Sequence, residues 1–224
     1  MNKIIHNIIS NGLHQNQPII QSGTKLDNAK SVMIMIHGRG ATAEDILSLS
    51  AEFNFDGVAY LAPQAKGNTW YPYSFLSPIE MNKPGITSGL ALIDSIVEML
   101  LQKGFSSEQI YLLGFSQGAC LNLEYAARNP KKFGGVFGLS GGLIGETITR
   151  ETYSGNLEGT EIFLGCSDVD PHIPLHRVNE TEEVFRNLGA KVTKRIYEGM
   201  DHTVNQDEID FVKTLLKQKT AKHF

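Results

Sequence analysis

The sequence has few cysteines, little net charge and no long apolar run, and each shortage excludes a class of protein. Its 224 residues include two cysteines, Cys120 and Cys166, in neither a CxxC nor a Cys/His spacing, so we expect no disulfide scaffold and no metal site. Lys and Arg number 20 against 24 Asp and Glu, so the net charge of −4 gives no reason to expect nucleic acid as a partner. No stretch approaches about 18 consecutive apolar residues, which predicts that no helix spans a membrane.

Cofactor and targeting motifs are also missing. Gly38 and Gly40 lack the third glycine of a dinucleotide fingerprint and the acid downstream of it, and no phosphate-binding loop is present, so we expect no cofactor. Residues 1–9 contain neither an apolar stretch nor a small-residue cleavage site of the kind that a signal peptide has. Together with two cysteines that are expected to be buried and reduced, this predicts a cytoplasmic protein.

Strand-like and helix-like segments alternate along the chain. Hydrophobic residues make up 41% of the sequence and charged residues 20%, which suits a large core. We expect strands at 18–22, 32–36, 58–61, 110–113, 135–139, 161–164 and 192–197, and helices from residue 42 and at 86–102, 119–128, 175–188 and 206–217. This alternation predicts an α/β fold of three layers, with a mostly parallel central sheet and helices on both faces.

Two segments match the Gly-x-Ser-x-Gly pattern of a nucleophile elbow, in which small residues let the chain turn sharply from strand to helix. The segment around Ser116 lies between the strand 110–113 and the helix 119–128. The segment around Ser140 also follows a strand, but it leads into a Gly/Thr-rich loop, 141–159, with at most a short helix. We therefore predict Ser116 as a nucleophile and Ser140 as a loop residue, since a helix N-cap role explains Ser116 but not both glycines.

A serine nucleophile needs a histidine that accepts its proton. Such elbows occur in chains that order the three groups as serine, acid and histidine. His202 lies between the last strand and the last helix, which is the correct end of a parallel sheet. The other histidines after Ser116 lie at the start of a helix or beside the terminus: His172, His176 and His223. His202 is the predicted base.

The acid that orients His202 has two candidates. Asp168 and Asp170 both follow the sixth expected strand. Pro171 restricts the preceding residue to extended conformations, which favours Asp170 but leaves Asp168 open. Asp201 is treated as a loop acid, because side chains of adjacent residues seldom pair.

Backbone N–H groups are expected to stabilise the oxyanion that forms on the substrate. One donor is the N–H of Gln117, the residue after the nucleophile, and the second is the N–H of Arg39 in the loop after the strand 32–36. The glycines of that loop let the backbone approach a substrate closely. We expect His37 to brace the loop through backbone hydrogen bonds rather than to bind a metal.

An irregular segment rich in aromatic residues and prolines, 68–84, is expected to form a functional loop or a lid. Its Trp70, Tyr71 and Phe75 are candidates for contact with an apolar or aromatic part of the substrate. Packing in the core or in a lid is the alternative role for these side chains.

Four ordered segments resemble the carboxylesterase/phospholipase family of α/β hydrolases, which includes the acyl-protein thioesterases. They are Val-Met-Ile-Met-Ile-His-Gly-Arg-Gly-Ala (32–41), Gly-Phe-Ser-Gln-Gly-Ala (114–119), Asp-Pro-His-Ile-Pro (170–174) and Tyr-Glu-Gly-Met-Asp-His (197–202). The resemblance implies a single α/β-hydrolase domain over residues 1–224, with its core at about 18–217. It also implies the roles of five residues: Ser116 as nucleophile, His202 as base, Asp170 as acid, and Arg39 and Gln117 as backbone oxyanion donors.

The resemblance further implies a serine hydrolase that cleaves carboxylic esters or thioesters of a small-molecule or lipid-like substrate. Three alternatives stay open: a lysophospholipase or acyl-protein thioesterase acting on long acyl chains, a hydrolase of small cyclic or aromatic esters, and a non-catalytic binding protein. The family usually has a hydrophobic residue in place of Arg39, and many members have an Asp near Trp70 that this sequence lacks. Members are often dimers, so a homodimer is the expected oligomer, without integral membrane association.

Overall fold

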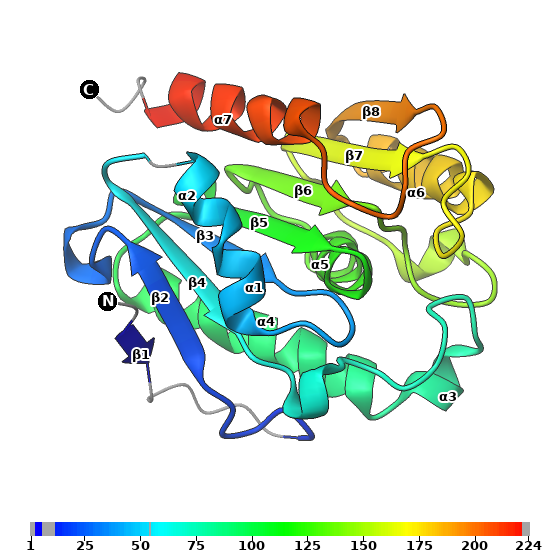
Figure 1. The fold of residues 1–224 in the computed structure, drawn as a ribbon, viewed down its shortest axis with the longest axis horizontal. Helices are drawn as coiled ribbons and strands as arrows, with labels where there is room; N and C mark the ends of the chain where they lie inside the picture. The colour runs from blue at the N-terminus through cyan, green and yellow to red at the C-terminus, as the bar shows by residue number, and fades with distance from the viewer. Residues whose placement is uncertain (1–2, 6–11, 54, 221–224) are drawn as a thin grey trace.

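The computed structural model describes residues 3–5, 12–53 and 55–220, and within this range eight strands form one central sheet (Figure 1). In spatial order the strands are β1 (Lys3–Ile5), β2 (Ile19–Gly23), β4 (Val58–Pro63), β3 (Ser31–Ile36), β5 (Ile110–Phe115), β6 (Gly135–Leu139), β7 (Glu161–Ser167) and β8 (Lys191–Tyr197). The pairs β1–β2 and β2–β4 are antiparallel, and all later pairs are parallel. The prediction of a mostly parallel sheet is thus confirmed.

Helices cover both faces of the sheet (Figure 1). They are α1 (Ala43–Leu47), α2 (Leu49–Phe53), α3 (Ile79–Asn82), α4 (Gly85–Gln102), α5 (Gln117–Arg128), α6 (Leu175–Asn187) and α7 (Gln206–Thr220). Buried side chains of α4, α5 and α6 share one apolar cluster, and those of α1, α2 and α7 share the other. Strand β3 is buried along its whole length and supplies both clusters: Ile34 packs on the first face and Met33 and Met35 on the second. This confirms the three-layer α/β architecture.

The expected elements are all present, with ends that shift by a few residues. For example, β7 continues to Ser167, three residues past its expected end, and α5 begins at Gln117 rather than at residue 119. The structure adds the short helix α2, the edge strand β1, and α3 inside the segment 68–84, which we expected to be wholly irregular. These elements have three to five residues each, too few to show a clear periodicity in sequence.

Helix α4 is long and apolar enough, by length and composition, to cross a membrane. Core helices pass the same test, and half of α4 is buried inside the structure. Its buried side chains belong to the first apolar cluster, so it packs here as a core helix. The expectations about most of residues 1–9 and about His223 fall outside the described residues.

Candidate active site

Ser116 occupies a sharp turn between β5 and α5, as the elbow motif predicts. Its backbone angles are φ 54° and ψ −121°, a conformation that is strained for a residue with a side chain. The flanking glycines permit this turn. A Cβ on Gly114 would overlap the backbone of Gly118, and a Cβ on Gly118 would overlap the carbonyls of Ile36 and His37 at the end of β3. The two glycines therefore bring the serine, the start of α5 and the loop after β3 together.

Ser116, His202 and Asp170 form a continuous chain of hydrogen bonds. The Ser116 hydroxyl lies 2.8 Å from Nε2 of His202, and Nδ1 of His202 lies 2.7 Å from Oδ2 of Asp170. If Nε2 accepts the serine proton, Nδ1 must carry the ring hydrogen, and this N–H donates a hydrogen bond to the carboxylate. The carboxyl ends of β5, β7 and β8 supply these residues, because parallel strands end at one edge of the sheet.

The Asp170 carboxylate is held in its ionised form. Burial disfavours the charge, but hydrogen bonds from His202 and from the backbone N–H groups of His172 and Ile173 outweigh it, so the pKa of Asp170 lies below its usual value. Oδ1 accepts those two backbone bonds at 2.8 and 3.0 Å, which leaves Oδ2 directed at the imidazole. An ionised partner suits the stabilisation of an imidazolium at His202.

Asp168, the other candidate acid, faces a different group. Its Oδ1 accepts a hydrogen bond from the backbone N–H of Gly199 at 2.8 Å, and its own N–H donates to the carbonyl of Tyr197. Asp168 thus holds the loop that leads to His202 rather than contacting its ring. Asp201 is exposed, as expected of a loop acid.

Ser140, the serine of the second Gly-x-Ser-x-Gly segment, is buried, and no hydrogen bond joins its hydroxyl to a histidine among the described residues. Its backbone N–H donates to the carbonyl of Gly165, and its Oγ has no hydrogen-bond partner within the described part of the chain. A loop rather than a helix follows it, as the sequence predicts. His176, another rival from the sequence, is exposed on α6.

The loop after β3 lies against the nucleophile. A Cβ added to Gly38 would lie 3.4 Å from the Cβ of Ser116. Over the described residues, the backbone N–H groups of Arg39 and Gln117 have no protein acceptor, which leaves them available to an oxyanion. His37 braces this loop, as expected: its Nδ1 lies 2.7 Å from the Gly38 carbonyl, and its Nε2 accepts from the N–H of Ala65 at 3.1 Å. Burial lowers the pKa of His37, which favours the neutral ring.

The aromatic segment forms a fixed wall, defined here as residues 70–75. Its backbone N–H and C=O groups form hydrogen bonds with side chains instead of with the backbone of a helix or strand. Gln117 accepts from the N–H of residue 70 and donates to the carbonyl of residue 71, at 2.8 Å each. Arg39 donates to the carbonyls of residues 72 and 73 at 2.7 and 2.6 Å, and Asn82 bonds the N–H of residue 73 and the carbonyl of residue 74 at 2.9 and 2.8 Å. Three side chains therefore hold the wall in place, and no pattern in the sequence predicts these bonds.

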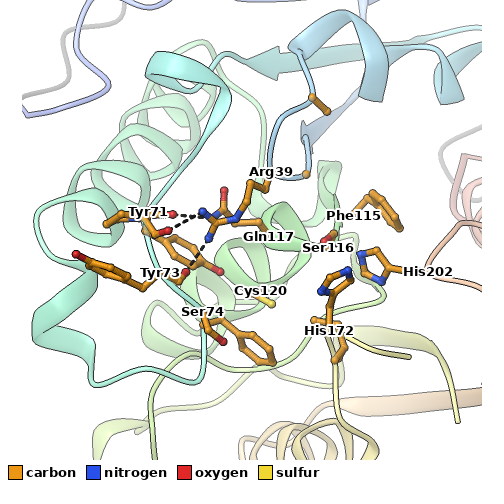
Figure 2. Close-up of a pocket in the computed structure, with 15 residues that line it drawn as sticks. Arg39, Tyr71, Tyr73, Ser74, Phe115, Ser116, Gln117, Cys120, His172 and His202 are labelled. Atoms are coloured by element: carbon orange, nitrogen blue, oxygen red, sulfur yellow. Dashed lines mark hydrogen bonds between the residues drawn. The ribbon is translucent and has the colours of Figure 1, made fainter. Parts of the chain in front are cut away.

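A cavity of about 450 Å³ opens beside Ser116 (Figure 2). Tyr71 and Phe75 line it, together with Phe115 and Ile173, so two of the three aromatic candidates are in place to contact a substrate. Trp70 is not among the lining residues. Its indole is fully buried, packs against the rings of His14 and His37, and donates to the His37 carbonyl at 2.9 Å. Trp70 therefore supports the site from the core, and its expected contact with substrate is corrected.

Cys120 also lines the cavity, but its chemistry differs from that of Ser116. Burial raises the pKa of the Cys120 thiol to about 12, which keeps it protonated and a poor nucleophile. Cys120 and Cys166 are both free and buried. No group of three or more metal-ligating side chains occurs among the residues that the structure describes.

Comparisons with known proteins identify relatives over nearly the whole length of this chain. Acyl-protein thioesterase 1 of Kluyveromyces lactis is 29% identical over 88% of this chain and 96% of its own length. The protein of the same name from Saccharomyces cerevisiae is 26% identical over 90% of this chain and 98% of its own length. Such relatives support an esterase or thioesterase activity.

A solved structure of a phospholipase/carboxylesterase from Dyadobacter fermentans is 41% identical, with a TM-score of 0.87, over 95% of this chain and 100% of that one. The Bacillus cereus carboxylesterase, at 19% identity and a TM-score of 0.68 over 91% of this chain and 94% of that one, shares the fold. A family profile described as phospholipase/carboxylesterase matches residues 15–220. The chain therefore belongs to the phospholipase/carboxylesterase family of α/β hydrolases, and it is a hydrolase.

Proposed function

We propose that this protein hydrolyses carboxylic esters or thioesters through a covalent acyl-enzyme on Ser116. The observation that carries the proposal is the continuous hydrogen-bonded chain from Ser116 through His202 to Asp170, at 2.8 and 2.7 Å. It ends in a carboxylate whose pKa is lowered and begins at a strained serine beside a cavity. Such a chain activates a hydroxyl that is otherwise a weak nucleophile.

In the first half of the reaction, Ser116 Oγ attacks the substrate carbonyl while Nε2 of His202 takes the hydroxyl proton. Asp170 stabilises the imidazolium through Nδ1–H. The negative charge that develops on the carbonyl oxygen is stabilised by the N–H groups of Arg39 and Gln117. His202 then gives its proton to the departing alcohol or thiol, and the acyl group stays on Ser116.

In the second half, a water molecule replaces the leaving group beside His202. Nε2 takes a proton from this water, the resulting hydroxide attacks the acyl carbon, and the same two N–H groups hold the second oxyanion. Collapse of this intermediate returns the proton from His202 to Ser116 Oγ and releases the carboxylic acid. Each residue thereby returns to its starting protonation state.

Hydrolysis of p-nitrophenyl esters from acetate to palmitate tests the proposal. We expect the Ser116→Ala variant to lose on the order of 10⁴-fold or more of the wild-type rate. Ser140→Ala is a matched control, because it removes the hydroxyl of the second Gly-x-Ser-x-Gly segment, and we expect it to keep the wild-type rate. Full activity of the Ser116→Ala protein would contradict the proposal.

Cleavage of acyl-protein thioesters is the second candidate, and the names of the relatives favour it. The matched acyl-protein thioesterases of yeasts cover nearly the whole chain. A rate that rises toward palmitate and depends on Ser116 would support lysolipid or acyl-protein substrates. A rate that peaks at acetate or butyrate would support small esters instead, in keeping with a cavity whose wall is pinned by Arg39, Gln117 and Asn82.

We also infer that the chain acts as one catalytic domain in the cytoplasm. Two free, buried cysteines support a reducing compartment. One sheet that includes strands from Lys3–Ile5 to Lys191–Tyr197 supports a single domain.

A further inference from the structure

The cavity beside Ser116 is lined by basic groups without an acidic one. Among its described lining residues are Arg39, His172 and His202, and none is an Asp or a Glu. The side chain of Asp170 is fully covered, so its charge faces His202 and not the cavity. The protein carries a net charge of −4, yet this concave surface offers no carboxylate that would repel an anionic substrate.

The Arg39 guanidinium is a fixed positive charge in the cavity wall. Two of its five N–H donors bond the carbonyls of Pro72 and Tyr73, at 2.7 and 2.6 Å. Carbonyl oxygens are neutral acceptors, and over the described residues no carboxylate lies within ion-pair distance of the Arg39 guanidinium. The carbonyl bonds and the ring of Tyr71, 5.9 Å away, hold the guanidinium in place, so little freedom is lost when it binds an anion.

The geometry of the reaction decides which part of a substrate meets Arg39. The leaving group must lie on the His202 side of Ser116, because His202 returns the proton to it. The carbonyl oxygen points to the backbone N–H groups. Figure 2 shows Tyr71 and Tyr73 on the side of Ser116 away from His202, with Arg39 next to them. The acyl part therefore extends along the wall and toward the guanidinium.

We propose that the acyl part of the substrate ends in a carboxylate, so that the protein cleaves half esters or half thioesters of dicarboxylic acids, and that Arg39 binds this carboxylate. The inference rests on the proposed function of the same site. Tyr71, Phe75 and Ile173, which line the cavity, contact the carbon chain between the ester carbonyl and the terminal carboxylate. The three N–H groups of the guanidinium that do not bond the wall lie in the same plane, and planar N–H donors suit a carboxylate. Arg39 is exposed, so its effect is screened and weakens as salt is added.

A pair of esters of equal chain length tests this proposal. p-Nitrophenyl hemiglutarate and p-nitrophenyl valerate both have five acyl carbons, and only the first carries a terminal carboxylate. We expect wild-type kcat/KM to be at least tenfold higher for the hemiglutarate, after the rate with Ser116→Ala protein is subtracted. Arg39→Met should bring the ratio of the two kcat/KM values to one or below, and Arg39→Lys should restore part of it.

The ratio separates recognition of charge from general damage, because a displaced wall or oxyanion loop slows both esters. Arg186→Met removes an exposed arginine on α6 outside the cavity and should keep the wild-type ratio. Equal kcat/KM values in the wild type, or a preference for the hemiglutarate that survives in Arg39→Met, would overturn the inference while the proposed function stands. Failure of the wild type to cleave either ester would overturn both. Should Arg39→Met not fold, the wild-type ratio and Arg39→Lys still decide.

Discussion

Two aspartates two positions apart, Asp168 and Asp170, have different tasks, and substitution of each separates them. Asp170 bonds the His202 ring, whereas Asp168 bonds a backbone N–H in the loop before it. We expect Asp170→Asn to lower kcat on the order of 10³- to 10⁴-fold, because an amide does not stabilise the imidazolium and can impose the wrong tautomer. Asp168→Asn should cost less than about tenfold. Steady-state hydrolysis of one p-nitrophenyl ester measures both, and equal losses would contradict the assignment.

The sequence could predict Ser116 and His202, but it left the acid open. Strand, turn and helix signals surround Ser116, and only His202 lies between the last strand and the last helix. Asp168 and Asp170 follow the same strand, and which carboxylate faces the imidazole depends on how the loop after β7 turns. Resemblance to the family selected Asp170, the one that lies within hydrogen-bond distance of His202.

The role of a side chain within an irregular segment is also beyond sequence patterns. Trp70 and Tyr71 are neighbours of similar chemistry, yet Trp70 packs in the core and Tyr71 lines the cavity. No periodicity distinguishes inward from outward positions in such a segment. The same holds for the side chain of Gln117, which bonds residues 70 and 71 from 47 and 46 positions away in the chain.

At the scale of elements, Asn82 at the end of α3 takes over hydrogen bonds that a strand would provide. It is fully buried and bonds the N–H of Tyr73 and the carbonyl of Ser74. Asn82→Leu leaves both groups unpaired, so we expect a loss of about 2–4 kcal/mol in the free energy of unfolding. Its exposed neighbour Met81 provides the control, since Met81→Leu should change this free energy by less than about 0.5 kcal/mol. Urea denaturation measures both, and similar values would refute the role of Asn82.

Helix α7 begins with a capping box that follows the His202 loop. The Glu208 N–H donates to Oδ1 of Asn205 at 3.0 Å, and the Asn205 N–H donates to Oε2 of Glu208 at 2.9 Å. Glu208 is fully buried, and its Oε1 has no partner within the described residues. Burial raises the pKa of Glu208 from 4.5 to about 7.

This raised pKa makes the stability of the protein depend on pH. Between pH 4.5 and 7 the folded state keeps the Glu208 proton that the unfolded chain releases. The contribution of this group to the free energy of unfolding is therefore full below pH 4.5 and is lost as pH rises through 7. The loss amounts to roughly 3 kcal/mol at most. A glutamine at this position is neutral at every pH. The free energy of unfolding of Glu208→Gln should therefore fall less than that of the wild type as pH rises from 5 to 8.

Urea unfolding at several pH values measures this difference. Asp210→Asn is the matched control, because Asp210 is an exposed acid on the same helix, and it should follow the wild-type pH dependence. A Glu208→Gln variant with the same pH dependence as the wild type would show that Glu208 is ionised in the folded protein.

Long helices and strands were far easier to predict from the sequence than short ones. Strand β3 is a run of six buried residues, and α4 repeats apolar residues at helical spacing over 18 positions. Helix α3 has four residues, begins after Pro78 and lies in a segment whose prolines and aromatics indicate a loop. Four residues are too few to show a helical repeat, and Asn82 at the end of α3 bonds the wall through a side chain that no periodicity marks.

At the scale of the whole molecule, the sheet brings Arg39, Ser116, Asp170 and His202 to one edge although they span most of the chain. We expect a single cooperative unfolding transition, as befits one domain. Trp70 is the only tryptophan and is fully buried beside the site, so its fluorescence reports on that region. Fluorescence and far-ultraviolet circular dichroism should give coincident urea curves, and two separated transitions would indicate two folding units. The homodimer stays a prediction, which sedimentation equilibrium would test.

The central claim, that Ser116 is the nucleophile, is tested most directly by covalent labelling. A fluorophosphonate reacts with an activated serine, and intact-mass analysis with peptide mapping locates the adduct. We predict one adduct per chain in the wild type and in Ser140→Ala, on the peptide that contains Ser116, and none in Ser116→Ala. An adduct that persists in Ser116→Ala, or that maps to Ser140, would contradict the account.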